Sequence, residues 1–198
     1  MNSDWRAAPE RAELQRAVEL IATDPSGARM ELERLAASSS EIARQMAMYN
    51  IAIAYSNGVF GEPDYAKAEE WYASAARNGL REAEFGLGHT LRKTGQYARA
   101  LDVFRRSAAI GYSPSMRAIG GMYFRGEGVP HDLNQSRLWW ERSIERGNVF
   151  AKRDFAFAKM KGKYGWAQRP LGVVLFLSAV ASACHIIFTS SERDERLK

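Results

Sequence analysis

The sequence contains little of the chemistry that most catalytic or metal-binding sites require. Among its 198 residues there is one cysteine, Cys184, so no disulfide can form within the chain. This low cysteine content is typical of proteins of a reducing compartment. Its three histidines, His89, His131 and His185, lie far apart, and no paired-cysteine, HExxH or serine-nucleophile pattern accompanies them. The sequence therefore predicts no catalytic residue, no metal site and no cofactor.

An excess of charge of one sign is also missing from most of the chain. The formal net charge is +5, but residues 1–149 carry equal numbers of acidic and basic side chains. The excess lies in residues 150–169, where six Lys and Arg side chains stand against Asp154 alone. Because the basic charge forms one local block, the sequence predicts no nucleic-acid partner.

An apolar leader is absent from the N-terminal region. Charged residues between Asp4 and Glu13 interrupt every apolar run, so no secretory signal is predicted, and residues 1–8 are expected to be disordered. Pro9 is suited to the first turn of a helix that is expected to stop at Asp24-Pro25. A second helix is expected from about Gly27 to residue 37. This pair is interpreted as a degenerate repeat that caps the N-terminal end.

The chain does contain a repeated pattern of small, aliphatic and aromatic residues at helical spacing. Three copies end at Gly79, Gly111 and Gly147, which are 32 and 36 positions apart. Each copy has two apolar stripes separated by a turn, and a glycine past a stripe can take the left-handed conformation that ends a helix. A near-constant period of this length indicates stacked helix-turn-helix units. The predicted fold is all-α, a short right-handed α-solenoid.

Two of the copies carry a more specific motif of turn glycines and helix aromatics. In the third copy its residues are Ile119-Gly120, Tyr123, Gly126-Glu127-Gly128-Val129, Asp132, Trp139-Trp140 and Gly147. In the first copy they are Asp64, Lys67-Ala68 and Trp71-Tyr72. This pattern resembles the Sel-one-like repeat, a branch of the tetratricopeptide-like solenoids, over residues 43–162. The middle copy lacks the glycine-rich insertion and is more similar to a plain tetratricopeptide unit.

The resemblance implies an adaptor or scaffold that binds a protein or peptide, and it supplies no catalytic residue. In such stacks the first helix of each unit lines a concave face on which partners lie. The non-core positions of those helices are Tyr49, Ser56, Asn57, Phe85, His89, Arg92, Lys93, Arg117, Phe124 and Arg125. Aromatic rings interleaved with Arg and Lys suit an extended acidic peptide. The alternative is an ordinary solvated face.

The longest apolar run, Leu171 to Phe188, has 18 residues and no formal charge. At ~1.5 Å rise per residue this segment would span roughly 27 Å, close to a hydrocarbon core of ~30 Å. It is predicted to be a transmembrane anchor, and the alternative is a hydrophobic helix that folds back over the open end of the solenoid. The juxtamembrane basic residues are Lys159, Lys161, Lys163 and Arg169. By the positive-inside rule, they place the repeats in the cytoplasm of a single-pass, tail-anchored protein.

The membrane would be the inner membrane if the source is bacterial, which the excess of Arg over Lys favours. Small residues four apart, Ser178 with Ser182 and Ala179 with Ala183, would allow a homodimer through the anchor.

The function predicted from the sequence is a membrane-tethered, non-enzymatic adaptor. The alternative is an accessory or regulatory subunit of a membrane enzyme or transport complex that contacts its partner through the transmembrane helix. The predicted divisions are a disordered start at 1–8, an N-terminal cap at 9–40, repeats at 41–79, 80–111 and 112–147, a capping half-repeat at 148–165, an anchor at 166–190 and a tail at 191–198.

Overall fold

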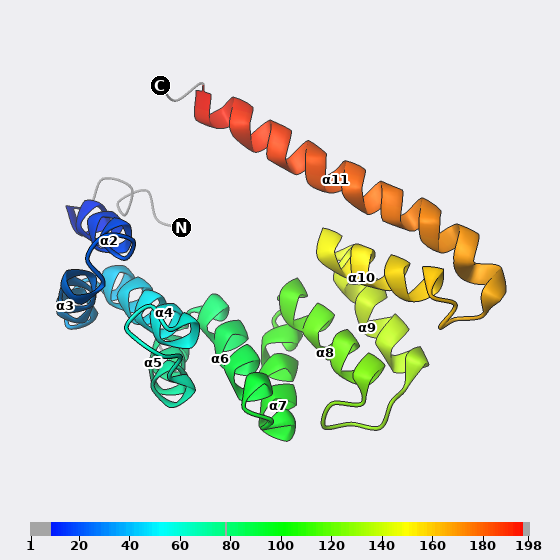
Figure 1. The fold of residues 1–198 in the computed structure, drawn as a ribbon, viewed down its shortest axis with the longest axis horizontal. Helices are drawn as coiled ribbons and strands as arrows, with labels where there is room; N and C mark the ends of the chain where they lie inside the picture. The colour runs from blue at the N-terminus through cyan, green and yellow to red at the C-terminus, as the bar shows by residue number, and fades with distance from the viewer. Residues whose placement is uncertain (1–8, 78, 196–198) are drawn as a thin grey trace. The chain divides into compact units, whose positions relative to one another are not determined.

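The computed structural model describes residues 9–77 and 79–195, and for 188 and 190–195 it describes the backbone alone. The expected disorder of residues 1–8, and the tail residues 196–198, lie outside this range. All regular elements within it are helical, which confirms the predicted fold class (Figure 1). In chain order they are α2 (Pro9–Leu20), α3 (Pro25–Ala36), α4 (Glu41–Asn57), α5 (Tyr65–Arg77), α6 (Arg81–Lys93), α7 (Tyr97–Ala109), α8 (Ser113–Arg125), α9 (Leu133–Glu145), α10 (Val149–Met160), the 3-10 turn η1 (Trp166–Gln168) and α11 (Arg169–Glu195).

The chain forms two compact units, Met1–Val103 and Phe104–Lys198. In the first unit each helix packs against the next, α2 on α3, α3 on α4, α4 on α5 and α5 on α6. In the second unit α8 packs on α9, α9 on α10 and α10 on α11. Contacts between sequence neighbours are the pattern of a helical-repeat solenoid, in which each pair is stabilised by the adjacent pairs.

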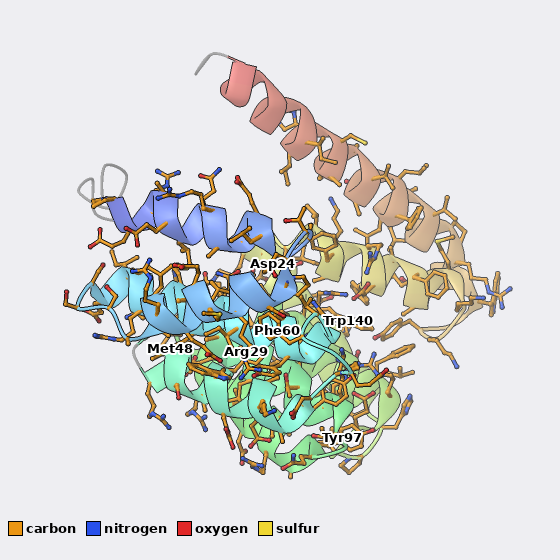
Figure 2. The ribbon with its side chains drawn as sticks, turned by 60° about the vertical axis from the view of Figure 1, so that its left-hand side comes forward. Asp24, Arg29, Met48, Phe60, Tyr97 and Trp140 are labelled. Carbon is orange, nitrogen blue, oxygen red and sulfur yellow. The ribbon has the colours of Figure 1, made fainter. Side chains whose placement is uncertain are left out.

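Glycines end the helices as the sequence predicted. Gly79, Gly111 and Gly147 have φ angles of 89°, 86° and 80°, in the left-handed region. The N-terminal boundary differs from the expectation, because α2 ends at Leu20 and α3 begins at Pro25. Asp24 is the N-cap of α3, where its carboxylate accepts a hydrogen bond of 2.9 Å from the Gly27 backbone N–H (Figure 2).

The core of the first unit is built largely from alanines, which allow close helix packing. Tyr55, one of its two buried tyrosines, lies edge-on to Phe60 with ring centroids 5.2 Å apart. The Arg29 guanidinium and the Lys67 ammonium lie 5.8 Å and 5.2 Å from the Tyr55 ring (Figure 2 labels Arg29 and Phe60). These cation–π contacts hold α3 and α5 against the end of α4. The fully buried cluster includes Ala17, Leu32, Leu35, Ala47, Ile51, Ala52, Ala68, Ala75 and Ala83.

The core of the second unit depends on the fit between one glycine and one tryptophan. A Cβ placed on Gly120 would lie 2.6 Å from Cδ1 of Trp140, so α8 and α9 approach as closely as the glycine permits. The Trp140 indole N–H donates to the Arg117 carbonyl at 3.2 Å, which fixes the ring. Trp140 in turn packs with Ala151, Phe155 and Ala158 of α10.

We expect Gly120→Ala to destabilise the protein by about 1–3 kcal/mol, because the added methyl group meets an indole that is hydrogen-bonded in place. The matched control is Gly121→Ala on the same helix, where the nearest atom is the mobile end of Arg125 at 2.9 Å. That change should be neutral or stabilise by up to about 1 kcal/mol through helix propensity. Thermal unfolding of the full chain, followed by circular dichroism in one detergent, compares them, and equal midpoints would contradict the close-packing argument.

Candidate functional site

The second unit contains a pocket of about 460 Å³ at the junction of its last four helices. We call it the arginine pocket, because three guanidinium groups line it. The lining residues are Arg117, Gly121, Phe124 and Arg125 of α8, Trp140 of α9, Arg153, Asp154, Phe157 and Ala158 of α10, and Phe176 of α11.

The charges of the arginine pocket are arranged around Asp154. The Arg117 Nε atom lies 2.6 Å from one carboxylate oxygen of Asp154, and the Arg153 guanidinium lies 2.8 Å from the other. Arg125 pairs with Glu127 at 2.6 Å, just outside the lining. Each of these pairs engages one or two of the five N–H donors of a guanidinium. The lining therefore has three positive groups against one negative group.

Aromatic rings form the apolar part of the arginine pocket. The Phe124 and Trp140 rings lie with centroids 5.4 Å apart, and Figure 2 labels Trp140. Next to the pocket, the Phe150 ring lies 5.8 Å from the Arg117 guanidinium and 5.5 Å from that of Arg153. Rings that stack with guanidinium groups keep the cations oriented without neutralising them.

Three of the residues that the sequence assigned to a binding face meet in this pocket, namely Arg117, Phe124 and Arg125. Sequence reasoning missed Arg153 and Phe157. The repeat template could have found Arg153, which stands two positions after Ala151 as Arg117 stands two positions after Ser115. Treating this region as a cap and a basic block hid that correspondence.

The predicted face residues of the first unit make separate local contacts. Tyr49 is half-buried with its ring 5.9 Å from that of Tyr72, and burial, with a smaller contribution from Glu82, raises the pKa of its phenol. Phe85 and His89 lie edge to face at 4.6 Å. The remaining three residues, Lys93, Arg92 and Asn57, lie at or near helix ends. The Lys93 ammonium is 5.2 Å from the Tyr65 ring, the Arg92 side chain is half-buried and the Asn57 side chain is exposed. Their assignment to a binding face stays a prediction.

Helix α11 packs one face against α10 (Figure 1). A Cβ on Gly172 would lie 2.7 Å from the Met160 backbone nitrogen, which shows how closely the two helices approach. Further along, Ala179 is 3% exposed, and the Lys152 ammonium donates to the Ser178 hydroxyl at 2.6 Å.

The opposite face of α11 is apolar and bare. Val174 and Leu177 are 64% and 61% exposed. The segment Trp166–Ile187 is long and apolar enough to cross a membrane by length and composition, and 11% of its apolar window is buried. The structure thus combines a fold-back contact with α10, which the sequence left as the alternative, and an uncovered apolar surface.

Within the part of the chain that the structure describes, no group of three or more His, Cys, Asp or Glu side chains is placed to hold a metal ion. Cys184 is exposed on α11.

Comparisons with known proteins agree with this architecture. The Sel1 repeat profile matches residues 45–80 and 113–148. A protein of Acanthamoeba polyphaga mimivirus named for sel1-like repeats is 29% identical over 76 residues, which are 38% of this chain and 14% of that protein.

Two solved structures share the fold. A protective antigen of uropathogenic Escherichia coli strains, which displays an SLR fold, matches with a TM-score of 0.66 and 24% identity, over 90% of this chain and 39% of that one. A Sel1 repeat protein from Oxalobacter formigenes matches with a TM-score of 0.65 and 19% identity, over 85% and 69%.

The chain spans only a small part of the viral relative and less than half of the Escherichia coli protein. Solenoids of this kind generally mediate protein–protein interaction and are typically non-catalytic scaffolds. With two matched repeats, a repeat-containing relative and two structural neighbours of the same fold, the chain contains Sel1-like repeats and has the solenoid fold of such repeats.

Proposed function

We propose that this protein is a membrane-tethered, non-enzymatic adaptor whose repeats bind a protein or peptide partner. The observation that carries the tether is the bare face of α11, represented by Val174 and Leu177. The core helix of a soluble protein buries most of its surface, whereas only 11% of the apolar stretch within Trp166–Ile187 is buried. Transfer of that face into hydrocarbon would remove it from water.

The charges next to α11 support a cytoplasmic location for the repeats. Lys159, Lys161, Lys163 and Arg169 all precede the apolar segment, and cytoplasmic flanks of membrane helices are enriched in such residues. Trp166 is 81% exposed at the same end, where an indole suits the interface between headgroups and hydrocarbon. Near an anionic membrane surface each Lys or Arg contributes about 1 kcal/mol of attraction. The proposed topology is a single pass with the repeats in the cytoplasm.

The arginine pocket is the proposed partner site, and its chemistry suits an acidic peptide that also carries an aromatic or aliphatic residue. Incoming carboxylates would compete with Asp154 and Glu127 for the guanidinium groups of Arg117, Arg125 and Arg153. Because these arginines are half-exposed and already paired, binding should be moderate in strength and should weaken with salt. In the first unit, Phe85, His89, Arg92 and Lys93 carry the same kinds of side chain, and with Tyr49 and Asn57 they remain the predicted binding residues of that unit.

A second candidate function is an accessory subunit of a membrane enzyme or transport complex. The observation that favours it is again the bare face of α11, because another membrane helix could cover this face in place of lipid. In this structure Ser178 and Ala179 face α10, so a contact of that kind, a homodimer included, would use the larger residues of the opposite face. Under this alternative, changes on α11 would abolish partner capture and changes in the arginine pocket would not.

For the tether, we expect Leu177→Arg to move the full chain from the carbonate-resistant membrane pellet into the supernatant. An arginine near the centre of a span raises the free energy of insertion by about 3 kcal/mol relative to leucine. The matched control is Leu138→Arg on α9, which adds the same charge at a 40% exposed position and should leave the protein in the pellet. Wild-type protein in the supernatant would contradict the tether.

For the partner site, we expect Arg125→Glu to weaken binding of a short fluorescent peptide of alternating glutamate and phenylalanine by about tenfold, or ~1.4 kcal/mol. The substitution reverses one charge of the pocket and places two carboxylates side by side. Arg106→Glu on α7 changes the net charge equally at an exposed position away from the pocket lining. Fluorescence anisotropy at two salt concentrations measures both variants, and equal losses for both would indicate non-specific attraction instead of the pocket.

A further inference from the structure

The contact between α10 and α11 extends along nearly the whole apolar segment that the proposed anchor requires. Gly172 lies against the backbone of Met160 and Ala156, at the end of α10. Ser178 is hydrogen-bonded to Lys152, one turn from the start of α10. Ser182, His185 and Ile186 line a pocket together with Gly147, Asn148 and Val149. The two helices are therefore antiparallel, and α10 runs beside residues 172–186.

Helix α10 carries charges that are incompatible with the interior of a bilayer. Lys152, Arg153 and Asp154 are consecutive, and Lys152 contacts α11 near the middle of the apolar segment. Asp154 is also paired with Arg117 of α8, so α10 cannot move into hydrocarbon without carrying this network with it. A helix α11 that spans the membrane must for this reason leave α10.

We infer that α11 exchanges between two positions, docked on α10 away from the membrane and inserted in the bilayer, and that the exchange regulates the arginine pocket. This inference rests on the proposed tether and partner site. Phe176 links the two positions, because it lines the arginine pocket and also an adjoining apolar pocket of about 190 Å³. That second pocket is otherwise formed by Val149, Phe150, Arg153, Ala179, Val180 and Ala183.

Insertion of α11 removes Phe176 from the wall of the arginine pocket. The pocket then continues along α10, because Leu175 packs in the docked state against the cluster that contains Phe155 and Ala158. A peptide can follow this uncovered surface only when α11 is in the membrane. Partner binding and membrane insertion therefore favour each other, since each selects the state in which α11 has left α10.

Gly172 supplies a way to disfavour the docked state without weakening the anchor. In Gly172→Leu the new side chain meets α10 backbone atoms 2.7 Å and 2.9 Å from the Cβ position, while the apolar segment becomes more apolar. Val174→Leu is the matched control, because it adds apolar surface on the bare face of the same helix, at a position that is 64% exposed.

The experiment measures the distance between nitroxide labels on cysteines introduced at Phe150 and Ile186 of the full chain, with Cys184→Ser. Both sites are exposed, and they lie far from the connection between α10 and α11. Spectra are recorded in dilute detergent-free buffer and after mixing with vesicles of phosphatidylcholine and phosphatidylglycerol, and flotation of the vesicles reports insertion. From the ~1.5 Å rise per residue of the helix beyond the connection, release should lengthen the distance by on the order of 20 Å.

We expect the distance between the two labels to be short in buffer and long in vesicles. This should hold both for the labelled chain without a further substitution and for the labelled chain with Val174→Leu. Gly172→Leu should give the long distance in both conditions. Protein that floats with the vesicles but keeps the short distance would overturn the exchange and leave the tether standing. A long distance in buffer for the unsubstituted chain would also overturn it, because no docked state would then exist. Absence of flotation would refute the tether itself, and the exchange with it.

Discussion

Each helix pair of this chain needs a neighbouring pair to cover its apolar stripe, and this constraint shapes both units. The contact between Gly120 and Trp140 shows how the need is met, because a glycine on one helix admits the largest side chain of the next. The stack must nevertheless end. At the C-terminal end, α10 has one face on α9 and offers the other to α11, which covers it through Gly172 and Ala179.

The same end of the second unit also carries the excess of basic residues that gives the chain its net positive charge. The basic block that makes the sequence net positive begins on α10 and continues to the start of α11. Its first members, Lys152 and Arg153, contact α11 and Asp154, whereas Lys161 and Lys163 lie closer to the connection. One block thus contributes to two features, the arginine pocket and the basic flank of the apolar helix. The proposed partner site and the proposed membrane-proximal surface are adjacent because they share this segment.

Much of the fold and part of the site followed from local pattern. The glycines at Gly79, Gly111 and Gly147 could be assigned to helix ends because a left-handed backbone is a local requirement. Arg117, Phe124 and Arg125 could be assigned to one binding face because they are non-core positions of the same helix. Arg153 shared the pattern but was counted only as part of the basic block at residues 150–169. Phe176 had no equivalent in the repeat, so no periodicity could place it in the pocket.

The sequence alone determined the all-α repeat architecture, the similarity to Sel1 repeats and the presence of one helix long and apolar enough to span a membrane, because each depends on residue spacing within a short segment. Only the tertiary structure decided which face of that helix is covered. Residues 171–188 are apolar around the whole circumference, so their sequence shows no preferred side. The covered face is set by the close approach of the α10 backbone to Gly172 and by the hydrogen bond between Lys152 and Ser178. Both contacts depend on α10 lying beside α11.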